Sequence, residues 1–354
     1  MQNHKKELDN FISIVVKEGA SDIHFTAERY ATIRVMGNLI PLVNTPILSR
    51  EDTLGIAEVL IGEENFKKFL EKKEADFSYE VPDVVRFRGN AFFQKGAAGI
   101  ALRVIPSNIK TITELNLPPI IESFTRKKQG FFLVVGPVGQ GKSTTLASMV
   151  QLINHERAEH IVTIEDPIEY LFKEDRSIID QREVRLDTDD FRTALTAAFR
   201  QDVDVIMIGE MRDPETISTA VTAAETGHLV LSTLHTNNAS QTIDRIIDSF
   251  PASQQSQIRI QLAGSLIAIF SQRLVPRISG GQVPAYELLI NNNAVGSLIR
   301  EGRTHEINVI IETGLRDGMI DMNRSLADLV RRGEITPDNA YLHSFNPKGL
   351  EKLL

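Results

Sequence analysis

A glycine-rich segment between an apolar run and a helix-forming stretch constrains this chain more than any other feature. Residues 136–143 read GPVGQGKS and match the pattern G-x-x-x-x-G-K-[ST]. The apolar run FFLVV at 131–135 predicts a buried strand before the segment, and residues 142–154 predict a helix after it. Backbone N–H groups and a helix N-terminus then converge on phosphate oxygens. The segment predicts an α/β domain with a phosphate-binding loop.

The side chains of this loop suit a nucleotide with its metal ion. Lys142 is expected to contact the β- and γ-phosphates of ATP, and the Ser143 hydroxyl is expected to ligate Mg²⁺. The expected ATP-binding residues are Gly136, Pro137, Val138, Gly139, Gln140, Gly141, Lys142, Ser143 and Thr144. The side chain of Gln140 need not contact phosphate. The alternative is a chance glycine-rich turn, which the complete motif in its context disfavours.

Acidic and histidine side chains follow three further apolar runs. Glu210 comes after VIMI, Glu165 ends HIVTIE, and His235 comes after HLVLSTL. Runs without alternation indicate a parallel sheet covered on both faces, and ligands bind at the carboxyl ends of such strands. Glu210 is expected to polarise the attacking water, and Glu165 and His235 are expected to respond to the nucleotide. Glu210 and Glu165 are also expected to contact the Mg²⁺ of Ser143 through water. Each alone could be a solvated turn residue or a structural histidine, but their convergence favours a site.

Arginines are expected to stabilise the charge that spreads over the γ-phosphate oxygens during transfer. Arg86, Arg88 and Arg103 lie on strand-like runs, and Arg86 and Arg88 share one strand face. Arg200 and Arg212 flank the run before Glu210 and are candidates for binding phosphate or a neighbouring chain. Ordinary surface salt bridges are the alternative for each arginine.

The chain divides by pattern into two regions. Residues 1–105 mix helices with closely spaced strands and a hairpin signal at Gly37-Asn38, which indicates an antiparallel α+β domain. Residues 106–119, PSNIKTITELNLPP, predict a linker. Residues 120–354 predict the nucleotide-binding domain, with a mainly helical part from about 252 that includes a helix over 254–275. Asp213, Pro214 and Gly227 predict the start and end of one helix.

Composition excludes several classes of function. The chain has 354 residues, a net charge of −8 and no cysteine, so disulfides, thiol catalysis and thiolate zinc sites are excluded. The acidic balance argues against a nucleic-acid partner. No run approaches the ~20 apolar residues of a membrane-spanning helix, and no signal peptide is indicated. A cytoplasmic protein is expected, peripheral if it works at a membrane.

Together these segments resemble the secretion ATPases of the type IV pilus and type II secretion superfamily. Within it, the chain is most similar to the PilT-like pilus retraction (twitching motility) ATPases, over nearly its whole length. The matching segments are GASDIHF (19–25), RFRGNAFFQ (86–94), ALRVIP (101–106), GPVGQGKSTT (136–145), TIEDPIEY (163–170), FRQDVDVIMIGEMRD (199–213) and TGHLVLSTLHTNNA (226–239).

The resemblance implies a PAS-like N-terminal domain and a RecA-like motor domain, assembled as a homohexamer with ATP bound between the two domains. It implies that Lys142 and Ser143 carry phosphate and Mg²⁺, that Glu210 activates water, and that Glu165 and His235 sense the nucleotide. Arg86 and Arg103 resemble the arginines that reach the γ-phosphate. An inner-membrane pilus platform protein is the implied partner, and pilin is acted on indirectly, at the inner face of the cytoplasmic membrane.

Other functions remain open on the sequence. A pilus extension or type II secretion ATPase is one alternative, although such relatives usually carry an extra N-terminal domain and often a four-cysteine zinc insertion. An accessory retraction ATPase is another. A nucleotide-dependent binding module, such as a DNA-associated P-loop protein, is a third, which the acidic charge disfavours.

Overall fold

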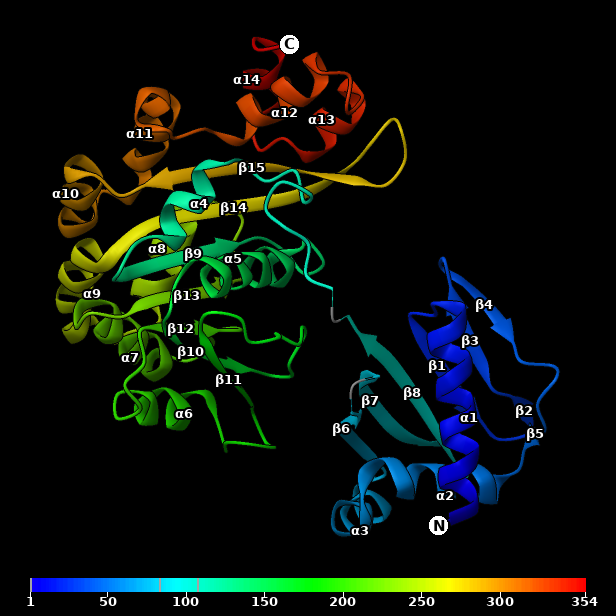
Figure 1. Ribbon diagram of the computed structural model, residues 1–354. Helices are drawn as coiled ribbons and strands as arrows, with labels where there is room; N and C mark the ends of the chain where they lie inside the picture. The colour runs from blue at the N-terminus through cyan, green and yellow to red at the C-terminus, as the bar shows by residue number, and fades with distance from the viewer. Residues whose placement is uncertain (1, 83, 107) are drawn as a thin grey trace. The chain divides into compact units, whose positions relative to one another are not determined.

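The computed structural model describes residues 2–82, 84–106 and 108–354. The chain forms two compact units, one of residues 1–108 with 169–171 and the other of residues 109–168 with 172–354 (Figure 1). Each unit has its own hydrophobic core and is described by itself. The chain has an α/β fold, with an antiparallel sheet in the smaller unit and a mostly parallel sheet in the larger one.

The smaller unit is a six-stranded antiparallel sheet in the order β4-β3-β1-β8-β7-β6. Its elements are α1 (Gln2–Glu18), β1 (Asp22–Thr26), β2 (Arg29–Tyr30), β3 (Thr32–Val35), β4 (Asn38–Pro41), β5 (Ile47–Leu48), α2 (Arg50–Ile61), α3 (Glu63–Lys72), β6 (Glu74–Val81), β7 (Val85–Gln94) and β8 (Ala97–Ile105). The hairpin expected around Gly37-Asn38 is confirmed as β3–β4, with its turn at Met36 and Gly37 and with Asn38 as the first residue of β4.

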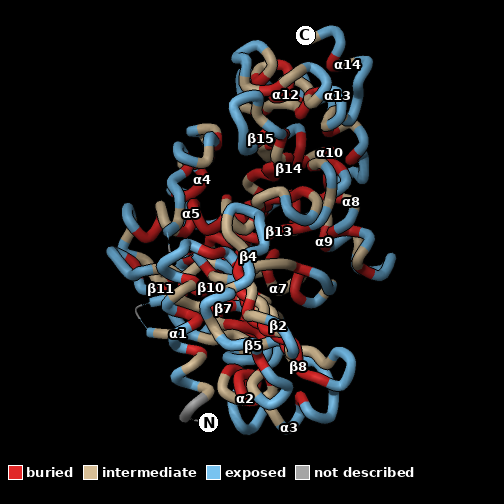
Figure 2. The backbone as a smooth tube through the Cα atoms, turned by 90° about the vertical axis from the view of Figure 1, so that its right-hand side faces the viewer, coloured by how far each residue is buried: buried red, intermediate tan, exposed pale blue. Residues whose placement is uncertain are grey.

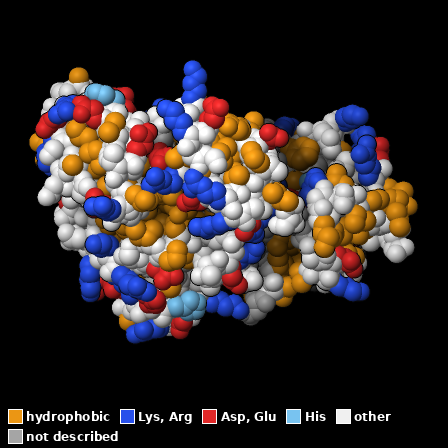
Figure 3. All heavy atoms as spheres, turned by 90° about the horizontal axis from the view of Figure 1, so that it is seen from above, with side chains coloured by type: hydrophobic (Ala, Val, Ile, Leu, Met, Phe, Trp, Pro, Cys, Tyr) orange, Lys and Arg blue, Asp and Glu red, His pale blue; other side chains and the backbone are white. Residues whose placement is uncertain are grey.

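One face of this sheet is apolar and the other is charged. Phe11 of α1 packs with Ile23 of β1 and Leu102 of β8 in the core. Because side chains alternate along a strand, Asp22 and Arg103 lie on the opposite face. Apolar side chains also stand exposed at the β3–β4 end of the unit, visible as orange spheres at the right of Figure 3; they are Met36, Leu39, Ile40, Val43 and Ile47.

The larger unit is built on a seven-stranded sheet in the order β11-β10-β12-β13-β9-β14-β15, parallel except for β15. Its strands are β9 (Gly130–Val135), β10 (His160–Glu165), β11 (Ile178–Glu183), β12 (Val205–Ile208), β13 (Leu229–Leu234), β14 (Leu266–Pro276) and β15 (Gln282–Ile290). Every residue of β9, β12 and β13 is buried, as Figure 2 shows for β13. Helices on both faces account for this burial, which confirms the sequence prediction.

Two groups of helices cover the two faces of this sheet. One face packs against α4 (Ile120–Thr125) and α5 (Lys142–Glu156). The other packs against α6 (Phe191–Ala198), α7 (Pro214–Glu225), α8 (Ala239–Asp248), α9 (Ala252–Ser265), α10 (Asn293–Glu301) and α11 (Ile307–Thr313). The 3₁₀ turns η1 (Thr304–Glu306) and η2 (Gly314–Asp317) flank α11, and α12 (Met322–Arg331), α13 (Pro337–His343) and α14 (Pro347–Glu351) end the chain.

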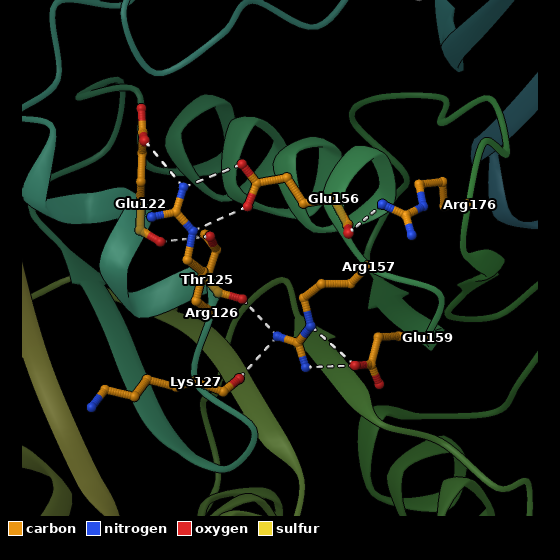
Figure 4. A network of polar contacts seen from close by, with 8 residues as sticks. All are labelled: Glu122, Thr125, Arg126, Lys127, Glu156, Arg157, Glu159 and Arg176. Carbon is orange, nitrogen blue, oxygen red and sulfur yellow. Dashed lines mark hydrogen bonds and ion pairs between the residues drawn. The ribbon is translucent and has the colours of Figure 1, made fainter.

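Arginine side chains tie α4 to the end of α5 (Figure 4). Arg126 donates two hydrogen bonds to Glu156, at 3.1 and 3.2 Å. Arg157 donates to the backbone oxygens of Thr125 and Lys127, at 2.6 and 2.9 Å. The helix that follows the glycine-rich loop is thereby fixed at its far end as well as by its apolar face.

The prediction of a mainly helical C-terminal part from about residue 252 is wrong in one respect. The helix expected over 254–275 ends at Ser265, and residues 266–276 form β14, which pairs with β9 and β15. An apolar run such as LIAIF suits a buried strand as well as a buried helix, and periodicity alone does not distinguish them. Helices dominate the chain only after β15.

Part of the stretch expected to be a linker, residues 106–119, belongs to the core of the larger unit. Ile112 and Leu117 are buried there with Phe124 of α4. The helix signals around α7 are confirmed, because Asp213 accepts a hydrogen bond from the Thr216 N–H at 2.8 Å, Pro214 is the first helical residue and Gly227 follows the helix with φ +113°.

Candidate active site

The carboxyl ends of four neighbouring strands carry the residues singled out from the sequence. The strands β10, β12, β13 and β9 lie side by side and parallel, so their carboxyl ends form one edge of the sheet. Glu165 ends β10, Glu210 follows β12, His235 follows β13 and the glycine-rich loop follows β9. This edge is where parallel α/β sheets bind ligands.

The loop between β9 and α5 has a backbone that excludes larger side chains at its start. Gly136 has φ +152°, and a Cβ there would lie 2.6 Å from the backbone oxygen of Gln272. At the other end of the loop, Gly141 caps α5 without a side-chain hydrogen bond. The N-cap residue of this fifteen-residue helix therefore leaves the helix N–H groups without a side-chain cap of its own, which suits the binding of an anion. The loop fits a nucleotide phosphate.

Lys142 is buried at the first position of α5, with 7% of its surface exposed. Its Nζ donates to the backbone oxygens of Gly136 and Pro137, both at 2.9 Å, and to Nδ1 of His235 at 3.2 Å. Since the ammonium group can only donate, Nδ1 of His235 accepts and the ring proton lies on Nε2. The lysine is thus held inside the loop where phosphate oxygens would meet it.

His235 joins this lysine to Glu210. The Nε2 atom of His235 lies 3.3 Å from Oε1 of Glu210, and Oε2 of Glu210 accepts a hydrogen bond from Arg212 at 2.8 Å. Burial acts to raise the pKa of Glu210, but the hydrogen bond and ion pair with Arg212 and the nearby charge of Lys142 outweigh it, so the pKa is lowered. Glu210 is therefore an ionised carboxylate at neutral pH, ready to accept a proton.

Glu165 is buried at the end of β10. This strand pairs with β12, which Glu210 follows. Glu165 accepts hydrogen bonds from Thr163 at 2.7 Å and from Gln181 at 3.5 Å. Gly209, which precedes Glu210, packs against Glu165: a Cβ on Gly209 would lie 3.5 Å from its Cα. The two carboxylates therefore come from adjacent strand ends.

The remaining loop residues lie where the sequence places them, between β9 and the first turn of α5. Ser143 and Thr144 are the second and third residues of α5. Val138 is exposed and Gln140 is half-buried. Ser143, one residue beyond the buried lysine, is the hydroxyl of this set that suits Mg²⁺ beside a bound phosphate.

Arg86 and Arg103 belong to the smaller unit and are paired with acids there. Nε of Arg103 donates to Asp22 at 2.9 Å, and its side chain is 72% exposed. Nη1 of Arg86 lies 3.4 Å from Glu80, and its side chain is 12% exposed. The surface-salt-bridge alternative thus fits the exposed Arg103, whereas Arg86 pairs with Glu80 from a largely buried position.

Two contributors to the site escaped the sequence reasoning, and a third was assigned a different contact. Gln181 of β11, Gln272 of β14 and Arg212 each bond a site residue, and only Arg212 had been considered, as a phosphate or subunit contact. Gln181 and Gln272 lie in strands that the sequence did not predict. No local motif marks either glutamine.

The comparisons with known proteins agree with this geometry. A family model described as "Type II/IV secretion system protein" matches residues 2–282. The type IV pilus retraction ATPase PilT of Pseudomonas aeruginosa is 42% identical over 334 residues, which are 94% of this chain and 97% of that protein. A twitching motility protein of Neisseria gonorrhoeae is 44% identical over 319 residues, 90% of this chain and 85% of that protein.

A solved structure extends the similarity to the fold. The crystal structure of the pilus retraction motor PilT with bound ADP superposes with a TM-score of 0.91 at 47% identity, covering 97% of this chain and 98% of that one. The strand-edge site and the glycine-rich loop define a P-loop nucleotide-binding fold. The chain belongs to the family of type II/IV secretion system proteins.

Proposed function

We propose that this chain is an ATP-hydrolysing motor that drives the retraction of type IV pili. The observation that carries the proposal is the contact chain from the phosphate-binding loop through Lys142 and His235 to the ionised Glu210. It unites a phosphate-binding cation with a proton acceptor at one strand edge. The similarity to retraction ATPases over more than nine-tenths of the chain supports pilus retraction as the process that ATP hydrolysis drives.

In the proposed cycle, the N–H groups of the loop and Lys142 bind the β- and γ-phosphates of ATP. Glu210 accepts the proton of the attacking water, while Glu165 helps to orient that water. His235 reports the state of the γ-phosphate, since it contacts both Lys142 and Glu210. Ser143 would hold Mg²⁺, which neutralises charge on the phosphates when bound.

Arg86 and Arg103 are proposed to stabilise the charge on the γ-phosphate, and the smaller unit is proposed to be a PAS-like domain. Each arginine is already oriented by an acid of its own sheet. We propose that the larger unit is a RecA-like motor domain and that the chain works as a homohexamer, in which hydrolysis opens and closes the units in turn.

The proposed partner is an inner-membrane platform protein of the pilus, through which pilin subunits are removed indirectly. The protein would act at the inner face of the cytoplasmic membrane without a nucleic-acid partner. Within residues 2–82, 84–106 and 108–354, no helix is both long enough and apolar enough to cross a membrane. The proposed boundaries are 1–105 for the N-terminal domain and 120–354 for the motor domain. Of the linker proposed over 106–119, the part around Ile112 and Leu117 packs in the core of the larger unit.

Deletion of the gene tests whether the ATPase drives retraction or extension of the pilus. We expect excess surface pili that fail to retract, restored to normal by the wild-type gene and by Lys128→Ala, an exposed control, but not by Lys142→Ala. Loss of surface pili on deletion would instead indicate an extension or secretion ATPase. Normal pili whose retraction only weakens under load would indicate an accessory retraction ATPase.

A further inference from the structure

The side chain of Gln140 points away from the phosphate-binding face of its loop and toward β14. Its Oε1 accepts a hydrogen bond from the Leu274 N–H at 2.7 Å. Its backbone oxygen accepts a second hydrogen bond from Nε2 of Gln272, also at 2.7 Å. Two bonds therefore fix the middle of the loop to a strand more than 130 residues further along the chain.

The register of β14 explains why a side chain, and not a neighbouring strand, accepts the hydrogen bond from the Leu274 N–H. The pairing of β14 with β9 ends at Ser271 opposite Val135, but β14 continues to Pro276. Beyond Val135 the chain turns into the loop, so the next backbone groups of β14 on that side have lost their strand neighbour. The amide of Gln140 takes the place of a strand at Leu274, because it offers the same kind of acceptor as a peptide group.

The same strand also holds the two ends of the loop. The Gln272 side chain accepts a hydrogen bond from Thr145 of α5 at 2.7 Å, while its Nε2 holds Gln140. The backbone oxygen of Gln272 lies against Gly136, where a Cβ would be only 2.6 Å away. The strand therefore contacts the start of the loop, its middle and the first turn of α5.

We propose that Gln140 is a positioning residue, which holds the loop amides in their phosphate-binding arrangement before the nucleotide arrives. Its bond to Leu274 reduces the conformational freedom that the loop must lose on binding. A shorter side chain such as serine has no atom that reaches as far as the Gln140 amide. This inference rests on the proposed nucleotide site, but it concerns a residue that need not touch the nucleotide.

The test replaces the amide by an apolar group of similar length. In the full-length chain, Gln140→Met is expected to raise the KM for ATP and the Kd for Mg·ADP about fivefold, as loss of one hydrogen bond predicts. The kcat should stay within about twofold, because the loop binds ground state and transition state alike. Gln282→Met, at an exposed glutamine of β15, is the matched control.

Hydrogen exchange at single-residue resolution provides a readout that does not depend on activity. The Leu274 amide of the wild-type chain should exchange slowly, and Gln140→Met should speed its exchange at least about tenfold while Ile269 stays protected. Gln140→Glu retains an acceptor and should retain the protection. Rapid exchange of Leu274 in the wild-type chain would overturn the inference even if the methionine variant did not fold.

Further outcomes separate this inference from the proposed function. An unchanged KM and Kd in Gln140→Met, or a loss confined to kcat, would overturn the positioning role. If Lys142→Ala hydrolysed ATP normally, the nucleotide site itself would be wrong. An inactive Lys142→Ala beside an unaffected Gln140→Met would leave the proposed function standing and remove only the role of Gln140.

Discussion

The charged side chains of the two units are held in different ways. In the larger unit, Lys142 is buried and is linked through His235 to a carboxylate whose pKa is lowered by its neighbours. In the smaller unit, Arg103 stands mostly exposed and its charge is balanced by Asp22 on the next strand. Low local dielectric strengthens interactions of the first kind, and water screens those of the second.

The difference teaches that Lys142 and Arg103 should differ in the effect of their removal, because the first charge is buried and the second is exposed. The groups of the larger unit are already arranged in one connected network at a strand edge. The arginines of the smaller unit are paired with acids of their own sheet, and their proposed action on a nucleotide requires the proposed assembly. Substitutions can test this ranking from its strongest member to its weakest.

The largest effect is expected at Lys142. Lys142→Ala removes the buried cation from the loop, and we expect kcat/KM for ATP to fall about 1,000-fold, or ~4 kcal/mol. Steady-state release of phosphate measures it, with Lys128→Ala as the control. A loss smaller than that of Arg103→Ala would reverse the comparison between the units.

A pH-dependent effect is expected at Glu287, a buried carboxyl on β15. Burial raises its pKa to about 7, although the Ala239 N–H and Ser271 hydrogen-bond to it. Between the usual value of 4.5 and about 7, the folded protein keeps a proton that the unfolded chain releases. The stability from this group is therefore present below pH ~4.5 and is lost as the pH rises to about 7, by ~3 kcal/mol in all.

Glu287→Gln removes this titration while keeping the shape of the side chain. Urea unfolding at a series of pH values should show a flatter stability curve for the variant across that window. The exposed Glu312→Gln should leave the wild-type curve unchanged. Parallel curves for wild type and Glu287→Gln would show that burial does not govern this carboxyl.

A smaller effect is expected at Arg103 of the smaller unit. Because its guanidinium is exposed and screened, Arg103→Ala should lower kcat about tenfold, ~1.4 kcal/mol, with little change in ADP binding. Arg29→Ala, an exposed arginine of β2, is the control. A thousandfold loss would mean that the assembly buries Arg103, and no loss would remove it from the proposed site.

The smallest effect is expected in the arginine network of Figure 4. The Arg126 side chain is 58% exposed, so Arg126→Met should lower the Tm by about 1 °C or less. Arg157 is 13% exposed and binds two backbone oxygens as well as Glu159, so Arg157→Met should lower the Tm by roughly 3–6 °C. Equal decreases in Tm for the two variants would contradict the expectation that the more buried arginine contributes more to stability.

Much of the larger unit follows from local pattern. The glycine-rich motif, the apolar runs before Glu165, Glu210 and His235, and the caps of α7 each carry their signal within a few residues. Parallel strands bring such ends together by topology, so local signals suffice to assemble the site.

The rest depends on contacts between distant segments. The bond from Leu274 to Gln140 and the strand identity of residues 266–276 arise only when β14 pairs beside β9. Likewise, Gly62 separates α2 from α3, although the helical spacing of apolar residues over 54–69 would by itself suit one continuous helix. An apolar run has the same composition whether tertiary pairing makes it helix or strand.

The proposed assignment of Glu210 as the proton acceptor is the claim on which the account depends most. Its direct test is ATP hydrolysis by wild type and Glu210→Gln, with the size of the assembly measured on the same samples and Glu351→Gln as the exposed control. We predict that Glu210→Gln loses about 1,000-fold in kcat while it binds ADP and assembles like the wild type. Hydrolysis at the wild-type rate by a correctly assembled Glu210→Gln would contradict the account.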